Sequence, residues 1–224
     1  MIQPFQKQTV ARILNAAEES FSLFGYHGAS IREVTKKAKV NLAAINYHFK
    51  DKPSLYCEVI ASRLRPINQS RLKKLTNAGE LAGNHPIPLP LILDIFARPF
   101  FELCENSNGN GIHLVRLIGR SMSEPMPFVE ALLAAELHPV TTRFAQSIRR
   151  HVPNLSAEEF MWRLNFVVGA MHHTLATMHR MKDLTKGLCR DNDPAEAMRH
   201  FSQFAVSTLT SPPAAYPTSS PGSK

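Results

Sequence analysis

The stretch VNLAAINYHFKDK, from Val40 to Lys52, begins with the pattern of a short helix that follows a tight turn. Asn41 is a good N-cap, because its side-chain oxygen can accept a hydrogen bond from an amide of the first turn. We therefore expect a helix from Leu42 to His48, with Ile45 and Phe49 facing inward. The other face carries small, amide and aromatic side chains, and the role of that face is the question the stretch raises.

A second short helix is expected directly before this one. Ser30-Ile31-Arg32-Glu33 has the pattern of a capping box, in which the serine hydroxyl bonds the amide of Glu33 and the glutamate reaches back. A longer helix should precede it and end at Gly25. Its apolar face is expected to comprise Val10, Ile13, Leu14, Ala17, Phe21 and Phe24. Two short helices joined by a tight turn, behind a supporting helix, are typical of a helix-turn-helix.

The positive charge of the chain is concentrated in the same region. Residues 1–75 hold 13 Lys and Arg and 5 Asp and Glu, so their net charge is 13 − 5 = +8, whereas residues 76–224 hold 13 of each. A basic small domain joined to a neutral larger one suggests that the small domain binds a polyanion. A basic surface kept for solubility is the alternative, and charge alone leaves it open.

The second helix of a helix-turn-helix enters the major groove of DNA by its N-terminus. Ala43 and Ala44 are small enough to let the helix backbone approach base edges, and the amides of Asn41 and Asn46 can bond adenine or phosphate. Phosphate contacts suit the residues where the chain leaves the groove: Tyr47, His48 and Lys52. The alternative is a helical bundle that serves packing only.

The pattern A-x-x-x-F-x-x-x-G-Y-x-x-x-S-I-x-x-V, from Ala17 to Val34, and the following VNLAAINYHFKDKPSLY resemble the TetR family of one-component transcriptional regulators. The resemblance covers about the first 65 residues. It implies a bacterial, cytoplasmic homodimer that binds double-stranded operator DNA. The implied DNA-binding residues are Ser30, Arg32, Lys39, Asn41, Leu42, Ala43, Ala44, Asn46, Tyr47, His48 and Lys52. Lys39 departs from the family, in which many members have Gly, and either adds a phosphate contact or changes the turn.

The remaining two thirds of the chain predict helices only, so the expected fold class is all-α. We expect a helix-turn-helix domain over 1–52, a helical effector-binding and dimerisation domain over 53–210, and a disordered tail over 211–224. Helices are expected over 52–75, 92–103, 112–122, 127–150, 157–182 and 194–209, with loops over 76–90 and 105–111. We find no strand pattern or glycine-rich nucleotide loop, and expect no cofactor.

The helix that follows a second capping box at Ser156 is apolar on almost every side, with Met161, Trp162 and Phe166 outside its main apolar face. Such a helix must be buried on every side. The last helix should turn Met198, Phe201, Phe204, Ala205 and Leu209 inward. The family resemblance implies that these two helices and their copies in a second chain form a four-helix dimer interface. A single large monomeric core is the alternative.

Aromatic and methionine side chains in the larger domain suggest an apolar effector cavity, although plain core is the alternative. Candidate effector-binding residues are Phe96, Phe100, Arg116, Arg120, Met122, Phe128, Trp162, Phe166 and Met171. The two arginines lie on one helix face, where they can meet a carboxylate or phosphate, or form surface ion pairs. The stretches VRLIGRSMSEP and FMWRLNFVVGA resemble a fatty-acid-responsive subgroup of the family. This implies a fatty acid or acyl-CoA as effector, with a drug-like or aromatic compound as the rival.

An enzyme is the competing class of protein. His113, His138, His172, His173 and His179 suggest a metal site in a helical bundle, yet no Glu-x-x-His pair accompanies them. No cysteine has metal-ligand spacing and no Ser-His-Asp order is recognisable. No run approaches the ~20 apolar residues of a membrane helix. We therefore expect no catalytic or metal site and no membrane partner, and favour a ligand-controlled repressor with a hydrophobic or amphipathic effector.

Overall fold

The computed structural model describes residues 4–105, 110–123, 126–189 and 193–212, and within these ranges the chain forms helices and no strand. The helices are α1 (Pro4–Gly28), α2 (Ile31–Ala38), α3 (Leu42–Phe49), α4 (Lys52–Ala82), α5 (Leu89–Glu105), α6 (Asn110–Ser123), α7 (Pro127–Arg149), α8 (Ala157–Thr177), α9 (Met181–Leu184) and α10 (Pro194–Thr210). A short 3-10 helix, Met178–Arg180, separates α8 from α9. The all-α prediction is confirmed. No described helix combines the length and hydropathy that crossing a bilayer requires.

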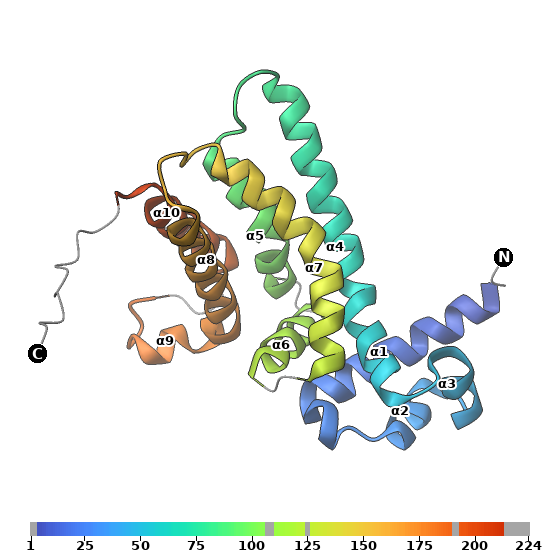
Figure 1. Cartoon of the computed structure of the whole chain (residues 1–224). Helices are drawn as coiled ribbons and strands as arrows, with labels where there is room; N and C mark the ends of the chain where they lie inside the picture. The colour runs from blue at the N-terminus through green and yellow to red at the C-terminus, as the bar shows by residue number, and fades with distance from the viewer. Residues whose placement is uncertain (1–3, 106–109, 124–125, 190–192, 213–224) are drawn as a thin grey trace, which may run out of the picture.

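The N-terminal helices form one end of the molecule and the C-terminal helices the other (Figure 1). Helices α1, α2 and α3 pack with the first turns of α4, which then continues along α7 into the larger domain. Helix α10 packs against both α5 and α8, and α8 and α10 lie side by side far from α3. Helix α4 therefore belongs to the cores of both domains.

Local capping explains where several helices begin. Asn41 accepts from the amide of Ala44 at 2.9 Å, Asp51 from Ser54 at 2.8 Å and Ser156 from Glu159 at 3.1 Å. The predicted starts of α3, α4 and α8 are thus confirmed, together with the predicted N-caps Asn41 and Ser156. The capping box predicted at Ser30 is only half right. Ser30 is the N-cap residue of α2, but its hydroxyl makes no capping bond, and the helix begins with the backbone bond from Val34 to Ser30.

The first apolar face is confirmed at Ile13, Ala17 and Phe21, which are buried, but it is wrong at Phe24, which is 57% exposed. The chain leaves helical geometry at Gly25, so the last turn of α1 does not continue that face. Phe204 of α10 is also exposed, because the buried face of this helix follows Met198, Phe201, Ala205 and Leu209 instead.

Two helix ends differ from the prediction. Helix α4 continues to Ala82 and ends at Gly83, so the predicted loop over 76–90 is wrong in its first half. The expected helix over 157–182 leaves α-helical geometry at Thr177, where the 3-10 turn begins. The predicted loop over 105–111 and the predicted tail lie largely outside the described residues. In both cases local composition predicted that a helix is present but not the residue at which it ends.

Polar side chains join the two domains. Ser22 of α1 and His113 of α6 are hydrogen-bonded at 2.6 Å, and Arg120 of α6 donates to the carbonyl of Leu23 at 3.5 Å. Arg63 of α4 donates to the buried carboxylate of Glu18 in α1 at 2.9 Å. The N-terminal end is therefore attached to the larger domain through α6 as well as through α4.

Gly25 lies at the centre of this junction. Its φ of +70° and ψ of 179° fall in a region that is nearly restricted to glycine. A Cβ atom there would also lie 2.7 Å from Nη1 of Arg120. The sequence needs glycine here because the backbone conformation is strained for any other residue, and a side chain would also displace the guanidinium of Arg120.

Gly25→Ala should lower the free energy of unfolding by about 1–3 kcal/mol, because the backbone conformation becomes strained. Urea unfolding of the two proteins measures the difference. Gly28→Ala is the matched control, since Gly28 has no positive φ and its nearest neighbour would lie at 3.4 Å. Equal effects of the two substitutions would contradict the assignment of strain to Gly25.

Candidate DNA-binding face and effector cavity

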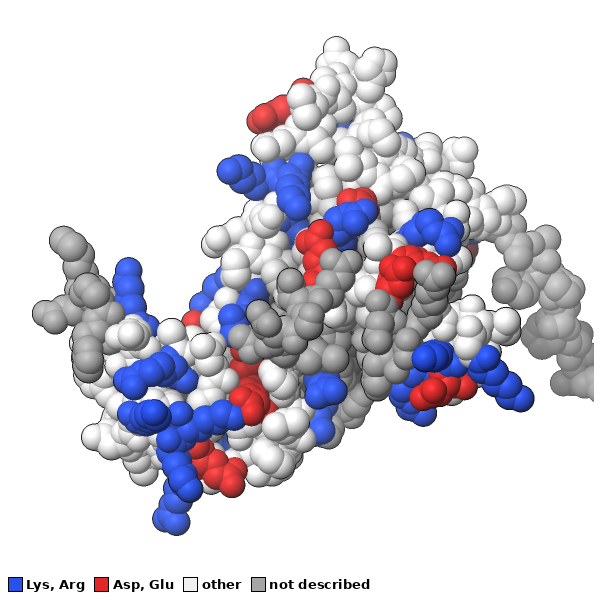
Figure 2. Space-filling model, turned by 180° about the vertical axis from the view of Figure 1, so that it is seen from behind, with Lys and Arg blue, Asp and Glu red and all other residues white. Residues whose placement is uncertain are grey.

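Helix α3 buries one face and exposes the other. Ile45 and Phe49 are buried as predicted, whereas Asn41, Asn46 and Tyr47 are exposed, the last by 76%. The small and amide side chains therefore lie on the solvent side, where a groove of DNA can reach them. The exposed side chains of Arg32, Lys36, Lys37, Lys39 and Lys50 belong to the same end of the molecule. Figure 2 shows Lys and Arg gathered over this end, at the lower left of the view.

Ten of the eleven predicted DNA-binding residues fall on α2, α3 and the turns beside them, Lys52 is the first residue of α4, and the structure brings all of them to one end of the molecule. The exposed ones are Arg32, Lys39, Asn41, Leu42, Ala43, Asn46 and Tyr47; the half-buried ones are Ser30, Ala44, His48 and Lys52. Of the half-buried residues, Ala44 and His48 belong to α3, whereas Ser30 and Lys52 lie at the starts of α2 and α4, so their side chains are shared between packing and any outer contact.

Lys39 has a left-handed backbone conformation, with φ 53° and ψ 50°. Its amide donates to the carbonyl of Lys36, and the amide of Val40 donates to that of Thr35 at 3.1 Å, which closes α2. Glycine adopts this conformation without strain, and other residues adopt it at a cost. Lys39 therefore keeps the turn that a glycine would make and adds an exposed positive charge.

Lys52 is held from inside the protein. Its ammonium donates to the carbonyl of Ala29 at 2.8 Å and lies 4.8 Å from the centre of the Tyr26 ring. Desolvation by partial burial lowers the pKa of Lys52. One of three ammonium donors is used, so two remain for a phosphate. Lys52 thus fastens the start of α4 to the segment before α2.

Tyr26 belongs to an aromatic cluster at the domain junction. Its ring centre lies 5.4 Å from that of Tyr56 and 5.2 Å from that of Phe128. Burial and the charge of Asp51 raise the pKa of Tyr26. Phe128, which the sequence assigned to the effector site, therefore packs at the junction with the DNA-binding end.

A small enclosed cavity of about 50 Å³ lies in the larger domain. Its walls come from α4, α5, α6, α7 and α8 and comprise Leu64, Arg71, Phe96, Phe100, Ile118, Leu133, Leu137, Val140, Thr141, Val168, Met171 and His172. Phe96, Phe100 and Met171 were predicted as effector-binding residues, and the structure brings these three together. The lining is apolar except for Thr141 and two nitrogen-bearing side chains, Arg71 and His172.

The guanidinium of Arg71 is the principal polar group of this cavity. Its side chain is only 1% exposed, although it carries a charge. Nε donates to the carbonyl of Phe96 at 2.7 Å, Nη2 donates to the same oxygen, and Nη1 donates to Oδ1 of Asn68 at 3.3 Å. The guanidinium carbon lies 4.3 Å and 4.4 Å from the ring centres of Phe96 and Phe100. Desolvation lowers the pKa of Arg71 to about 9, so the group remains charged at neutral pH.

His172 of α8 lies in the same wall. Its Nδ1 is buried and has no hydrogen-bond partner among the described residues. Desolvation, and then the positive charge of Arg71, lowers the pKa of His172. The imidazole is therefore neutral at neutral pH, and a neutral ring can place an N–H on either nitrogen.

Five other predicted effector residues lie elsewhere or are not described. Arg116 is exposed on α6, and Arg120 of α6 points to the α1 junction. Trp162 and Phe166 are 53% and 54% exposed on the outside of α8, with ring centres 5.8 Å apart. The side chain of Met122 lies outside the described part of the structure. Hydrophobicity alone selected Trp162 and Phe166, and it does not distinguish a cavity wall from an uncovered outer face.

Sequence reasoning missed Arg71 and named His172 only among possible metal ligands. A signal existed for the arginine. Leu64, Asn68, Arg71 and Leu75 recur at intervals of four, three and four residues, so the polar pair lies on the buried face of α4. Polar residues on an otherwise apolar helix face indicate a buried polar site.

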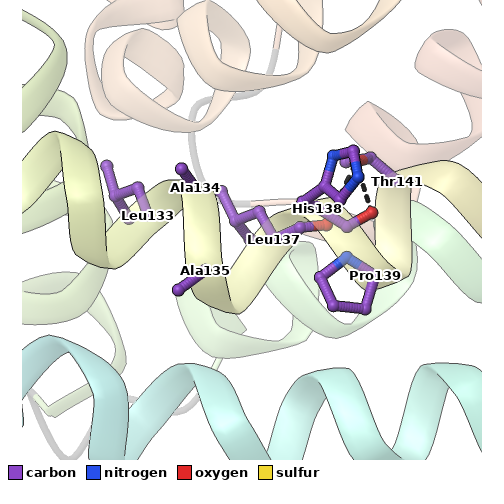
Figure 3. A pocket seen from close by; sticks show the side chains of 7 residues that line it. All are labelled: Leu133, Ala134, Ala135, Leu137, His138, Pro139 and Thr141. Carbon is purple, nitrogen blue, oxygen red and sulfur yellow. Dashed lines mark hydrogen bonds between the residues drawn. The ribbon is translucent and has the colours of Figure 1, made fainter.

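The cavity borders a wider apolar groove of about 650 Å³ between α7 and α8, with which it shares Phe96, Thr141 and Val168. A shallower hollow on α7 shares Leu133, Leu137 and Thr141 with the cavity. Figure 3 shows that its lining residues all belong to α7, around Pro139, and that Thr141 bonds the carbonyls of Leu137 and His138. The inner cavity thus adjoins both apolar hollows through shared wall residues.

Within the described ranges, no group of three His, Cys, Asp or Glu side chains is close enough to hold a metal ion. His113 bonds Ser22 of α1 instead, and His138 and His173 are exposed. The described histidines therefore do not form the bundle site that their spacing suggested.

Comparison with known families agrees with this geometry. The family described as "Bacterial regulatory proteins, tetR family" matches residues 13–59, and the one described as "Tetracyclin repressor-like, C-terminal domain" matches residues 94–207. The chain belongs to the TetR family. It is a transcription regulator with a DNA-binding helix-turn-helix, and α3 lies within the residues that match.

Individual relatives within the TetR family share 16–26% of their residues with this chain. The HTH-type transcriptional regulator UidR of Escherichia coli K12 is 26% identical over 202 residues, which is 90% of each chain. Among solved structures, Salmonella enterica GusR has a TM-score of 0.55 at 16% identity and covers 94% of this chain and 96% of its own. HlyIIR, a hemolysin II transcriptional regulator, has a TM-score of 0.57 at 17% identity, over 89% and 97% of the two chains. The structural likenesses support the fold.

Lys39→Gly should raise the free energy of unfolding by about 1 kcal/mol, because glycine removes the cost of the left-handed backbone. The same substitution removes a charge, so binding to random duplex DNA should weaken slightly. Lys39→Ala is the control: it removes the charge but keeps the strained backbone. A Lys39→Gly protein no more stable than Lys39→Ala would contradict the conformational reason.

Proposed function

We propose that this TetR-family regulator is a repressor that leaves its operator when a small molecule binds in the larger domain. The observation that carries the proposal is the position of the cavity at Arg71. It is walled by α4 and α6, and these two helices also hold the DNA-binding end. A ligand that changes the packing of this wall therefore acts directly on the attachment of the recognition helix.

The DNA-binding part of the proposal rests on α3. Its exposed face combines amide, small and aromatic side chains with surrounding Lys and Arg, which suits base edges and phosphates respectively. Of the eleven assigned residues, Asn46 is the sharpest candidate for a base contact, because it is exposed and contributes no cap. Asn41 has a double role, since its oxygen caps α3 while its amide nitrogen stays available.

Two chains are proposed to act together through α8 and α10. The outer side of these helices exposes Met161, Trp162, Phe166 and Phe204, although large apolar side chains usually avoid water. A second copy that covers this face would form a four-helix interface and would pair two recognition helices. Such a dimer would bind a near-palindromic operator, because half-site symmetry mirrors protein symmetry.

The coupling between the sites is proposed to run through α6 and α4. Ile118 of α6 lines the cavity, and on the same helix His113 and Arg120 bond α1 near its kink at Gly25. Leu64 and Arg71 of α4 line the cavity, and Lys52 starts the same helix in the DNA-binding end. A ligand that prefers one arrangement of this wall changes the spacing of the two recognition helices, which is allostery in the thermodynamic sense.

A fatty acid or acyl-CoA is the leading effector class. The apolar groove between α7 and α8 has room for an acyl chain, and the stretches from Val115 and from Phe160 resemble those of fatty-acid-responsive members. A drug-like or aromatic compound is the second candidate, with an efflux or degradation operon as the target. The aromatic walls at Phe96 and Phe100 favour it.

Repeated selection from random duplex DNA should enrich a near-palindromic sequence, and Asn46→Ala should then lose affinity for it by about tenfold or more. Its affinity for random DNA and its melting temperature should stay unchanged, because Asn46 is exposed. Asn41→Ser is the companion variant: serine keeps a cap and removes the amide. No enriched sequence would contradict the operator proposal, and equal losses on both kinds of DNA would remove Asn46 from base recognition.

Phe166→Glu should dissociate the dimer and weaken operator binding, since burying an unpaired carboxylate in the α8 face is costly. Sedimentation analysis at micromolar concentration measures the mass. Leu81→Glu is the control, because Leu81 is 90% exposed at the far end of α4. A Phe166→Glu protein that remains dimeric would exclude this face as the interface.

A further inference from the structure

We propose that Arg71 binds the carboxylate of a small organic acid, whose apolar part lies in the groove between α7 and α8. The effector is thus assigned a chemical class: a monoanion with an apolar or aromatic body. The inference deepens the proposed function and rests on it, because it takes the larger domain to be a ligand-binding domain. It uses the cavity described above and adds the group that selects its occupant.

The guanidinium of Arg71 has no counter-charge among the described residues. Among the described residues, the other two buried charged side chains are paired: Glu18 with Arg63 and Arg163 with Glu159. Arg71 is bonded only to the neutral groups of Phe96 and Asn68, and no described carboxylate forms an ion pair with it. A buried charge without a partner is costly, so a protein keeps one where a bound anion supplies the partner.

The guanidinium of Arg71 also has N–H groups that make no hydrogen bond to the described residues. A guanidinium has five N–H groups, and the three bonds to Phe96 and Asn68 leave two, one on each terminal nitrogen. A carboxylate has two oxygens and can accept both. Nδ1 of His172 lies unpartnered in the same cavity wall and can donate a third hydrogen bond from a neutral ring. The lowered pKa of His172 agrees with a neutral donor beside a cation.

The guanidinium of Arg71 is held rigidly by its neighbours. Phe96 and Phe100 lie against the guanidinium at 4.3 Å and 4.4 Å, and the carbonyl of Phe96 fixes one edge of it. The planar group is therefore held in one orientation before any ligand arrives, which lowers the entropy that binding costs. A lysine would give the same charge without this orientation.

The size of the cavity selects a carboxylate over a larger anion. A volume of about 50 Å³ has room for a few atoms, and one arginine supplies one positive charge. A phosphate dianion would keep an uncompensated charge in an apolar site. The cavity shares the wall residues Phe96, Thr141 and Val168 with the groove, so about 650 Å³ of largely apolar space adjoins it. The headgroup and body of an apolar acid thus match the two adjoining volumes.

Octanoate and 2-naphthoate serve as probes, with octanamide and 2-naphthamide as neutral partners of the same shape. At about 1 mM, the two acids should raise the melting temperature of the full-length protein, and titration calorimetry should show at least one acid bound about tenfold more tightly than its amide. Arg71→Met should remove that preference. Arg116→Met, on the exposed side of α6, is the matched control and should keep it.

The possible results distinguish failure of the anion site from failure of the proposed regulation. Equal binding of acid and amide by the wild-type protein, or no binding of either acid, overturns the proposal, and this comparison needs no variant to fold. A preference for the acid that survives in Arg71→Met also overturns it. Amides that bind and release operator DNA would leave the proposed regulation standing and remove only the anion. Acids that bind through Arg71 in a protein that selects no DNA sequence would support the anion site and defeat the operator proposal.

Discussion

Helix α4 has to fit two cores at once, and the rest of the structure follows from this constraint. At its start, Lys52 is bonded to Ala29 and Tyr56 is buried against the aromatic cluster of the DNA-binding end. Further along the same helix, side-chain hydrogen bonds join Arg63 to α1, Asn68 to α7 and Arg71 to α5. One helix thus links the packing of α1, α5 and α7.

A single chain leaves two features incomplete. The outer face of α8 exposes stacked aromatic rings, and the cavity beside α4 contains a cation without a counter-charge. The first is satisfied by a second copy of the chain, and the second by an acidic ligand, in the functions proposed for them. Both are departures from ordinary burial rules, and such departures concentrate at functional sites because function requires a surface or a charge that stability alone would remove.

Much of the DNA-binding end could be predicted because its determinants are local. Asn41 caps α3 with a residue three positions away, and Ile45 and Phe49 lie four apart on one helix face. The effector site could be predicted only in part. Phe96, Phe100 and Met171 do line the cavity, but Trp162 and Phe166 face outward, and hydropathy gives the same prediction for both groups.

The sequence by itself determined that the chain is helical, that its net positive charge lies within the first 75 residues, and where most helices begin, because periodicity and capping act within a few residues. Tertiary structure alone decided that Arg71 is buried between Phe96 and Phe100, that α6 bonds the kink of α1, and that α4 continues to Ala82. Those features depend on which distant residues meet across the packed helices, and no local pattern carries that information.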